Sequence, residues 1–321
     1  MSVTRERIQG ETAAAAMCIN RDDTSYPANL REIPLPPERL WVRGRVEADD
    51  TLAMAIVGAR EATPYGVGCA ERLAEDLAAR GITIISGLAR GIDSAAHRGA
   101  LRAGGRTIAV LGSGVDVIYP PENRRLALQV AEGGAVVSQF PLGTPPLAGY
   151  FPARNRVIAG LSLGVVVVEA AEKSGSLITA GLAGELGREV MAVPGPLTSL
   201  MSRGAHRLIQ DGAALVQGWE DVVAQLPLRF RDQVKPLAVP ANAGGPDRLV
   251  HGQHAEGHGE DKDAGDEESL LLLRVIGREP VGIDHIIERS GLAPGRASAL
   301  LMALEIEGRI RQLDGKLFVA A

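Results

Sequence analysis

Aromatic residues and cysteines are scarce in this 321-residue chain. Phe, Trp and Tyr make up 3% of the sequence although hydrophobic residues reach 45%, so Ala, Val, Leu and Ile must fill the core. The two cysteines, Cys18 and Cys69, are too few for a disulfide framework and fit a reducing compartment. The length allows two domains, one of them with a large buried core.

An excess of positive charge and long apolar runs are also missing. The net charge is −5, which argues against binding of polyanions by bulk attraction, so any nucleic-acid site must be local. The apolar run at 13–17 is too short for a secretory signal, and later apolar runs are interrupted by glycine or charge. We therefore expect a cytoplasmic protein without a membrane-spanning segment.

Standard nucleotide-binding and hydrolase motifs are absent as well. The Gly-x-Gly at 112–114 has Val117 where a dinucleotide fingerprint needs its third glycine. The sequence contains neither a P-loop nor a Gly-x-Ser-x-Gly motif. Both absences argue against the commonest nucleotide enzymes and against α/β-hydrolases.

Buried apolar runs alternate with amphipathic helical stretches from residue 51 to residue 228. This alternation predicts right-handed crossovers and a mostly parallel sheet. We therefore expect an extended Rossmann-like α/β domain with helices on both faces of the sheet. The expected strands are 52–57, 82–86, 107–111, 135–138, 165–169, 189–193 and 213–216, and the expected helices are 70–80, 94–103, 124–132, 155–161, 179–186, 205–210 and 219–226.

Two segments without a regular apolar period flank this domain. Residues 1–50 are expected to form a polar, proline-containing arm with one short edge strand at 41–45. Residues 229–266 are rich in Pro, Gly and charged residues, which predicts a flexible linker. Its three histidines, at 251, 254 and 258, suggest a metal site, but a plain linker is favoured because no cysteine accompanies them.

A second, small domain is expected at 267–321. Three helices, at 268–276, 283–290 and 295–307, precede a hairpin at 310–319, which is the winged-helix plan. Seven Lys and Arg residues stand against eight Asp and Glu, and the helix that would read DNA carries only Arg296 as a cation. A protein-contact or regulatory module is therefore favoured over a reader of duplex DNA.

Five glycine- or arginine-containing loops follow the expected strands, at the edge of the sheet where open α/β folds bind ligands. Glycine lets the main chain approach an anion, a helix N-terminus offers free N–H donors, and arginine adds a bidentate fork. Arg154 and Arg156 at an expected helix start oppose the helix dipole, so a bound anion explains them better than ion pairs. Residues 52–228 contain fifteen Lys/Arg and fifteen Asp/Glu, so the case for anion binding depends on the placement of the arginines. The loops are 56–66, 86–93, 111–114, 151–156 and 169–176.

Three motifs in these loops carry a family resemblance. They are Phe-Pro-x-Arg-Asn-Arg at 151–156, Gly-Leu-Ala-x-Gly-Ile-Asp-x-x-Ala-His at 87–97 and Ser-Gly-Ser-Leu-Ile-Thr-Ala at 174–180. Over roughly residues 25–225, the chain resembles the DNA-processing protein A family (DprA, also called Smf). It departs from the family pattern in three places: its arm is too short for a helical domain of the sterile-alpha-motif type, Ser138-Gln139 replaces a common Ser-Glu pair, and it has a C-terminal domain that is not universal in the family and whose acidic balance leaves its partner open.

The resemblance implies a non-enzymatic protein without a cofactor or metal that binds single-stranded DNA, often as a homodimer. It also implies that the protein protects incoming DNA and loads the RecA recombinase during natural transformation. Phe151 is expected to stack on a base, because stacking tolerates any sequence. The phosphate contacts implied by the matched motifs are Gly58, Arg60, Ser86, Gly87, Arg90, Gly91, Arg154, Asn155, Arg156, Ser174, Gly175 and Thr179.

Some residues also admit a catalytic interpretation. Asp93 and His97, four apart and near Ser86, suggest a triad, but a carboxylate at a helix N-terminus and a hydrogen-bonded, partly buried histidine are favoured. Glu169 is favoured as an acceptor for loop amides over a general base, and Lys173 is either a ligand of the pocket or a solvated charge. Two alternative functions stay open: an enzyme acting on a nucleotide or nucleoside phosphate in the same crevice, and a regulator whose winged helix reads duplex DNA.

Overall fold

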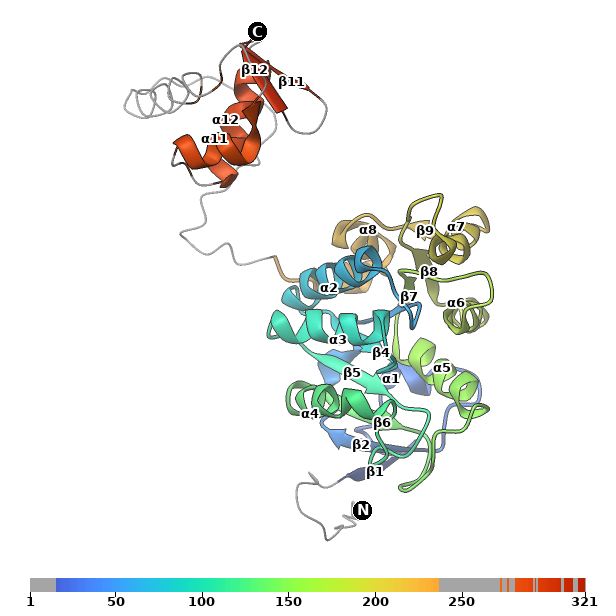
Figure 1. Ribbon diagram of the computed structural model, residues 1–321. Helices are drawn as coiled ribbons and strands as arrows, with labels where there is room; N and C mark the ends of the chain where they lie inside the picture. Colours follow the sequence, from blue (N-terminus) through green and yellow to red (C-terminus); the bar gives the residue numbers. More distant parts are fainter. Residues whose placement is uncertain are drawn as a thin grey trace. The chain divides into compact units, whose positions relative to one another are not determined.

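The larger of two folding units is built on a nine-stranded sheet (Figure 1). The computed structural model describes residues 16–236 and, further on, residues 272, 276, 281–290, 292, 294–306, 309–313 and 317–320. The strands are β1 (Met17–Asn20), β2 (Arg39–Gly44), β3 (Ala53–Val57), β4 (Thr83–Ser86), β5 (Thr107–Val110), β6 (Ala135–Ser138), β7 (Gly164–Val167), β8 (Glu189–Ala192) and β9 (Ala214–Leu215). Their order is β1-β2-β6-β5-β4-β3-β7-β8-β9, parallel from β6 to β9, with β1 and β2 antiparallel at one edge.

Helices cover both faces of the sheet because successive residues of a strand point to opposite sides. In β3, Ala55 and Val57 belong to one hydrophobic core, and Met54 and Ile56 belong to the other. This arrangement confirms the expected Rossmann-like α/β fold. The first face carries α1 (Ala28–Arg31), α5 (Tyr150–Leu161) and α6 (Gly175–Glu185); the second carries α2 (Pro64–Ala79), α3 (Ile92–Arg102), α4 (Arg124–Gly133) and α8 (Trp219–Gln225); and α7 (Arg203–Gln210) contacts β8.

The strand order reverses at β3. Strands β4, β5 and β6 follow it on one side, and β7, β8 and β9 on the other. Open α/β sheets bind ligands outside the carboxyl ends of the strands at such a switch point. The topology therefore places a candidate site between the loop after β3 and the loop after β7.

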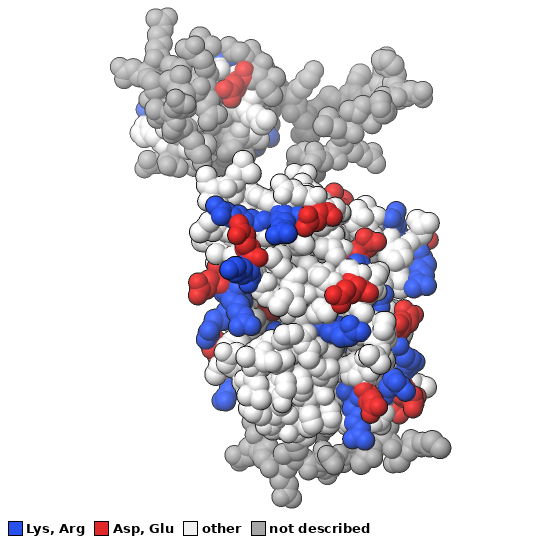
Figure 2. Space-filling view, turned by 90° about the vertical axis from the view of Figure 1, so that its right-hand side faces the viewer, with Lys and Arg blue, Asp and Glu red and all other residues white. Residues whose placement is uncertain are grey.

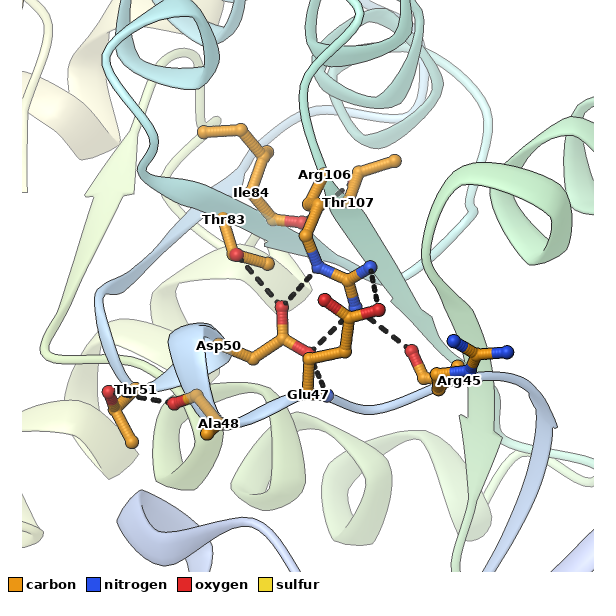
Figure 3. Close-up of polar contacts among 9 residues, drawn as sticks. All are labelled: Arg45, Glu47, Ala48, Asp50, Thr51, Thr83, Ile84, Arg106 and Thr107. Carbon is orange, nitrogen blue, oxygen red and sulfur yellow. Dashed lines mark hydrogen bonds and ion pairs between the residues drawn. The ribbon is translucent and has the colours of Figure 1, made fainter. Parts of the chain in front are cut away.

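The described part of the expected N-terminal arm, residues 16–50, belongs to this sheet. Strands β1 and β2 extend it beyond β6. The strand expected at 41–45 overlaps β2, which lies between β1 and β6 and is therefore not at the edge. The buried Asp50 carboxylate accepts two hydrogen bonds of 2.9 Å from Arg106 and one from the Thr83 hydroxyl (Figure 3). The structure differs from the expectation here because such long-range pairing leaves no signal in the local sequence.

Three helices begin four or more residues earlier than the apolar period predicted. The first residue of α2 is Pro64 instead of 70, that of α5 is Tyr150 instead of 155, and that of α6 is Gly175 instead of 179. Proline and glycine in the first turns concealed these starts, although proline is tolerated there because the first N–H groups have no partner within the helix. The Phe-Pro-x-Arg-Asn-Arg motif consequently lies inside α5 and not in the loop before it.

The chain leaves the larger unit later than expected. Phe230 in α9 (Leu228–Arg231) is buried, and the Lys235 amide donates to the Arg80 carbonyl at 2.9 Å. Residues 229–236 of the expected linker therefore pack on the α/β unit. The rest of the linker, with its three histidines, lies outside the described residues.

The second unit has the helix and hairpin order of a winged helix. Its three-stranded sheet has the order β10 (Val281–Gly282), β12 (Leu317–Ala320) and β11 (Ile310–Leu313). Along the chain, β10 precedes α11 (Ile283–Ser290) and α12 (Pro294–Ile306), and β11 and β12 follow them. Of the expected first helix, Leu272 and Ile276 are described, and both are buried in the core of this unit. The expected hairpin turn at 314–315 lies outside the described residues. None of the described helices is long and apolar enough to cross a membrane.

Candidate nucleic-acid interface

A cleft of about 560 Å³ lies at the switch point. Its walls come from the loop after β3, the first turns of α5 and the loop between β7 and α6. This volume is in the range of pockets that hold small ligands and cofactors. The predicted site residues that line the cleft are Gly58, Arg60, Phe151, Arg154, Asn155, Ser174, Gly175 and Thr179.

Two exposed cations and a helix N-terminus face this cleft. Arg60 follows β3 and Lys173 precedes α6, and within residues 16–236 neither pairs with a carboxylate. Ser174 caps α6, and its hydroxyl accepts a hydrogen bond from the Ser176 amide at 3.3 Å. Free N–H groups at a helix start attract anions, and the two cations reinforce this attraction.

The surface charge is otherwise mixed. On the face drawn in Figure 2, Lys and Arg side chains are interspersed with Asp and Glu around a broad uncharged area. Some of the exposed arginines are paired with carboxylates. Arg98 and Arg102, for example, both contact Glu71. This face therefore has no continuous basic surface that would attract an anion by charge alone.

Arg154 lines the cleft, but its guanidinium is turned into the protein, and only 4% of the residue is exposed. Its Nη1 donates to the Gly87 carbonyl after β4 and, at 2.8 Å, to the Val110 carbonyl in β5. Its Nε has no partner in the described part of the chain. Burial lowers the pKa of Arg154, and the nearby Asp93 carboxylate opposes this effect. Arg154 thus ties α5 to the ends of β4 and β5.

The loop after β4 is fixed beneath Arg154. Asp93 lies in the first turn of α3, as expected, and accepts hydrogen bonds from the amides of Gly87 at 3.1 Å and Ala89 at 3.4 Å. Burial raises the pKa of Asp93, although Arg154 and these amides oppose the shift. The buried Leu88 has a φ of +55°, a conformation uncommon for residues other than glycine. Strained backbone of this kind is concentrated at functional sites.

Ser86 and Gly91 shape this loop, and neither lines the cleft. The Ser86 hydroxyl is fully buried and donates to the Ile56 carbonyl at 2.6 Å. Gly91 has a φ of +71°, and a side chain there would collide with the carbonyl oxygen of Ala59. Glycine is therefore required by the backbone at this position.

The two other predicted arginines lie outside the cleft. Arg156 donates to the Pro34 carbonyl at 2.5 Å and so holds the N-terminal segment. Arg90 pairs with Glu122 at the surface, beside a smaller hollow. Asn155 does line the cleft, where its amide donates to the Gly175 carbonyl at 3.4 Å and connects α5 to the start of α6.

Phe151 lies between two guanidinium groups. The Cζ atoms of Arg60 and Arg154 are 5.2 Å and 5.8 Å from its ring centroid, and the Tyr119 ring centroid is 6.0 Å away. Sequence reasoning missed Tyr119. Its one signal was its place five residues after the glycine-containing loop at 111–114, in a chain with few aromatics.

The residues that suggested catalysis have structural roles. His97 is fully buried, its Nδ1 lies 2.7 Å from the Thr107 hydroxyl, and burial lowers its pKa to about 3. Glu169 accepts hydrogen bonds from the Thr63 amide at 2.9 Å and from the Thr63 hydroxyl at 2.6 Å. Both agree with the structural interpretation favoured from the sequence, although His97 is more deeply buried than expected.

Family models match both units of the chain. The model described as DNA recombination-mediator protein A matches residues 17–227, and the model described as DprA winged helix domain matches residues 258–316. The sequence is 42% identical over 302 residues to Protein Smf of Escherichia coli K12, covering 92% of this chain and 75% of that protein. It is 45% identical over 203 residues to the DNA processing protein DprA of Streptococcus pneumoniae R6, covering 63% and 72%.

Two solved structures share the fold of the larger unit. DNA processing protein A from Streptococcus pneumoniae has a TM-score of 0.63 and 43% identity, covering 66% of this chain and 75% of its own. DNA processing protein A from Helicobacter pylori, described for its unique single-stranded DNA binding mode, has a TM-score of 0.56 and 29% identity, covering 64% and 96%.

Proposed function

This chain belongs to the DNA recombination-mediator protein A family, and we propose that it binds single-stranded DNA through the switch-point cleft. The family membership confirms the resemblance seen in the sequence. The observation that carries the proposal is the convergence of Arg60, Lys173 and the N-terminus of α6 on one cleft, beside a half-buried aromatic ring at Phe151. Cations and free amides suit phosphates, and an aromatic ring suits a base of any identity.

Under this proposal, Lys173 joins the predicted phosphate contacts, which divide into two groups once Arg90 and Arg156 are set apart as lying outside the cleft. Arg60, Lys173, Gly175 and Thr179 would contact phosphate at the cleft, with Gly58, Asn155 and Ser174 shaping its walls. The second group would support the floor of the cleft without contacting phosphate. Its polar atoms bind other parts of the protein, or its backbone allows a close approach. This group consists of Arg154, Ser86, Gly87 and Gly91.

Binding without catalysis is the function favoured for this cleft. The two buried carboxylates near it, Asp93 and Glu169, already accept hydrogen bonds from the protein. A general base must lie within hydrogen-bond reach of a substrate proton. The exposed Glu61, which also lines the cleft, is the carboxylate on which the nucleotide-enzyme alternative would depend.

Delivery of the bound strand to RecA, in the cytoplasm and during natural transformation, is the finer part of the proposal. The matched family is described as a recombination mediator, which supports a role beside a recombinase. We also propose a homodimer, as the family resemblance implies. Light scattering of the full chain with and without single-stranded DNA tests the dimer, and strand exchange by RecA with and without the protein tests the delivery.

The binding proposal is tested by fluorescence anisotropy of the full chain with single-stranded DNA, duplex DNA and a mononucleotide. We expect affinity to fall in that order. Arg60→Ala and Lys173→Ala should each flatten the slope of log affinity against log salt by about 0.7, the value for one phosphate contact on a single strand. Arg125→Ala, an exposed arginine of α4 outside the cleft, is the matched control. Tighter binding of the mononucleotide, or unchanged slopes for both cleft variants, would contradict the proposal.

A further inference from the structure

Lysine is rare in this chain, and one lysine lies at the switch-point cleft. The sequence has 34 Lys and Arg residues, and the lysines among them are Lys173, Lys235, Lys262 and Lys316. Of the described residues that line the cleft, the cations are Arg60, Arg154 and Lys173. Lys173 therefore supplies the one side-chain amine in this wall of the described chain.

The Lys173 side chain is exposed, and no carboxylate within residues 16–236 forms an ion pair with it. The carboxylate next to it in the sequence, Glu172, pairs with Arg203 at 3.4 Å instead. Lys173 also directly precedes Ser174, the residue that caps α6. Its amine is consequently accessible to a molecule that enters the cleft.

Lysine and arginine differ in reactivity although both are cations. The arginine guanidinium stays protonated in proteins, whereas a lysine amine can lose its proton and is a target of acetylation. Cations and amides that hold a phosphate of DNA would also hold the phosphate of a small acyl phosphate. The acyl carbon of such a molecule would then lie in the same cleft as the Lys173 amine.

We propose that Lys173 is an acylation site whose substrate is an acyl phosphate held in the switch-point cleft. The inference rests on the proposed binding of phosphate at this cleft. After Lys173 Nζ has lost one proton to water, it attacks the acyl carbon, so that an N–C bond forms and the C–O bond to phosphate breaks. The phosphate leaves with a second proton from the amine, and the product is a neutral amide. Acylation would thus remove one positive charge from the cleft and weaken its binding of DNA.

The first test measures which lysines react with acetyl phosphate. The full chain is incubated with it, and acetylation of each lysine is followed over time by mass spectrometry. Lys235 is exposed and lies outside the cleft, so it is the control for exposure alone. We expect Lys173 to react at least about ten times faster than Lys235, because a bound phosphate places the acyl carbon beside the amine. Inorganic phosphate should slow the reaction at Lys173 and leave that at Lys235 unchanged.

A second acyl donor separates the effect of the cleft from the effect of exposure. The N-hydroxysuccinimide ester of acetic acid carries no phosphate, so it should acetylate Lys173 and Lys235 at similar rates. Equal rates at the two lysines with acetyl phosphate, or the same preference with both donors, would overturn the acylation site. If single-stranded DNA does not bind but inorganic phosphate still protects Lys173, the proposed function fails and the acylation site stands.

The second test measures what acylation does to binding. Each protein is treated with acetyl phosphate, and its affinity for oligo-dT is compared with that of its own untreated sample. The parent and Lys235→Arg should lose about fourfold in affinity at about 0.15 M salt, as expected for one lost phosphate contact with a salt slope of about 0.7. Lys173→Arg should keep the affinity of its untreated sample, because arginine is not acylated. An equal loss in Lys173→Arg would assign the effect to another lysine and overturn the proposal.

Discussion

The Arg154 guanidinium donates a hydrogen bond to the main-chain carbonyl of Gly87 and thereby joins α5 to the loop after β4. The same group reaches the Val110 carbonyl, and the Asp93 carboxylate holds the loop from the opposite side through the Gly87 amide. Gly87 leaves room for both, since a side chain there would collide with Arg154 and Asp93. Arg154, the first arginine of the Phe-Pro-x-Arg-Asn-Arg motif, therefore forms part of the floor of the cleft.

Replacing Arg154 should lower the stability of the protein, and DNA binding should weaken as a consequence. Arg154→Ala removes the donor to the Gly87 and Val110 carbonyls and the positive charge near the buried Asp93, and we expect a loss of about 3–5 kcal/mol in the free energy of unfolding. Denaturant unfolding followed by circular dichroism measures this loss. Arg156→Ala, whose side chain reaches one carbonyl at the protein surface, should lose about 1 kcal/mol. An Arg154→Ala protein of full stability that no longer binds DNA would assign Arg154 to phosphate contact instead.

The fate of these two arginines shows where sequence reasoning stopped. With α5 expected to begin at residue 155, Arg154 and Arg156 both stood at the helix start, and both were expected to bind the same anion. Because α5 begins at Tyr150, they lie two residues apart on a helix, where such positions do not share a face. One side chain consequently enters the core, and the other reaches Pro34.

Features of the structure that depend on neighbouring residues in the sequence could be predicted, and those that depend on distant residues could not. The parallel strands were predictable from continuous apolar runs, and Asp93 from its place at a helix start. The inward direction of the Ser86 hydroxyl depends on the Ile56 carbonyl thirty residues away, and the attachment of Asp50 depends on Arg106. Neither partner can be identified from periodicity or motif spacing alone.

Asp50 should be a principal attachment of the N-terminal segment. Its carboxylate is buried and paired at two points with Arg106, so Asp50→Asn leaves the partly buried guanidinium with the more exposed Glu47 as its remaining ion-pair partner. We expect a loss of about 3 kcal/mol in the free energy of unfolding, measured in denaturant. Asp49→Asn, an exposed neighbour in the same turn, should change it by less than about 0.5 kcal/mol. Equal effects of the two substitutions would show that the pair does not hold the segment.

Glu122 should weaken DNA binding by competing for Arg90. The contact with Arg90 lowers the pKa of the Glu122 carboxyl, so it is ionised at neutral pH. Glu122→Gln removes this negative charge and leaves Arg90 available to phosphate, and we expect roughly threefold tighter binding of single-stranded DNA with a salt slope steeper by about 0.7. Glu132→Gln, an exposed carboxylate near the other end of α4, is the control. Binding that is unchanged or weaker in Glu122→Gln would contradict the competition.

His97 should make the stability of the fold depend on pH. The Thr107 hydroxyl donates to the Ile84 carbonyl, so it accepts from His97 Nδ1–H, and the imidazole is neutral, with an Nε2 that has no partner among the residues that the structure describes. Burial lowers the pKa of His97 from 6.5 to about 3, so between these values the unfolded chain binds a proton that the folded chain does not. Stability attributable to His97 is therefore present above pH 6.5 and is lost as the pH falls toward 3.

The corresponding experiment compares the parent protein with His97→Gln. Between pH 7 and pH 5, the parent should lose about 2 kcal/mol more of its free energy of unfolding than the variant, because only the parent must keep this imidazole unprotonated. Denaturant titrations at half-unit pH steps measure the difference, and subtracting the variant removes the contribution of the carboxylates and the other histidines. Parallel curves for the two proteins over this range would mean that His97 is protonated in the folded state, and the core around Thr107 would then have to supply an acceptor for its Nε2.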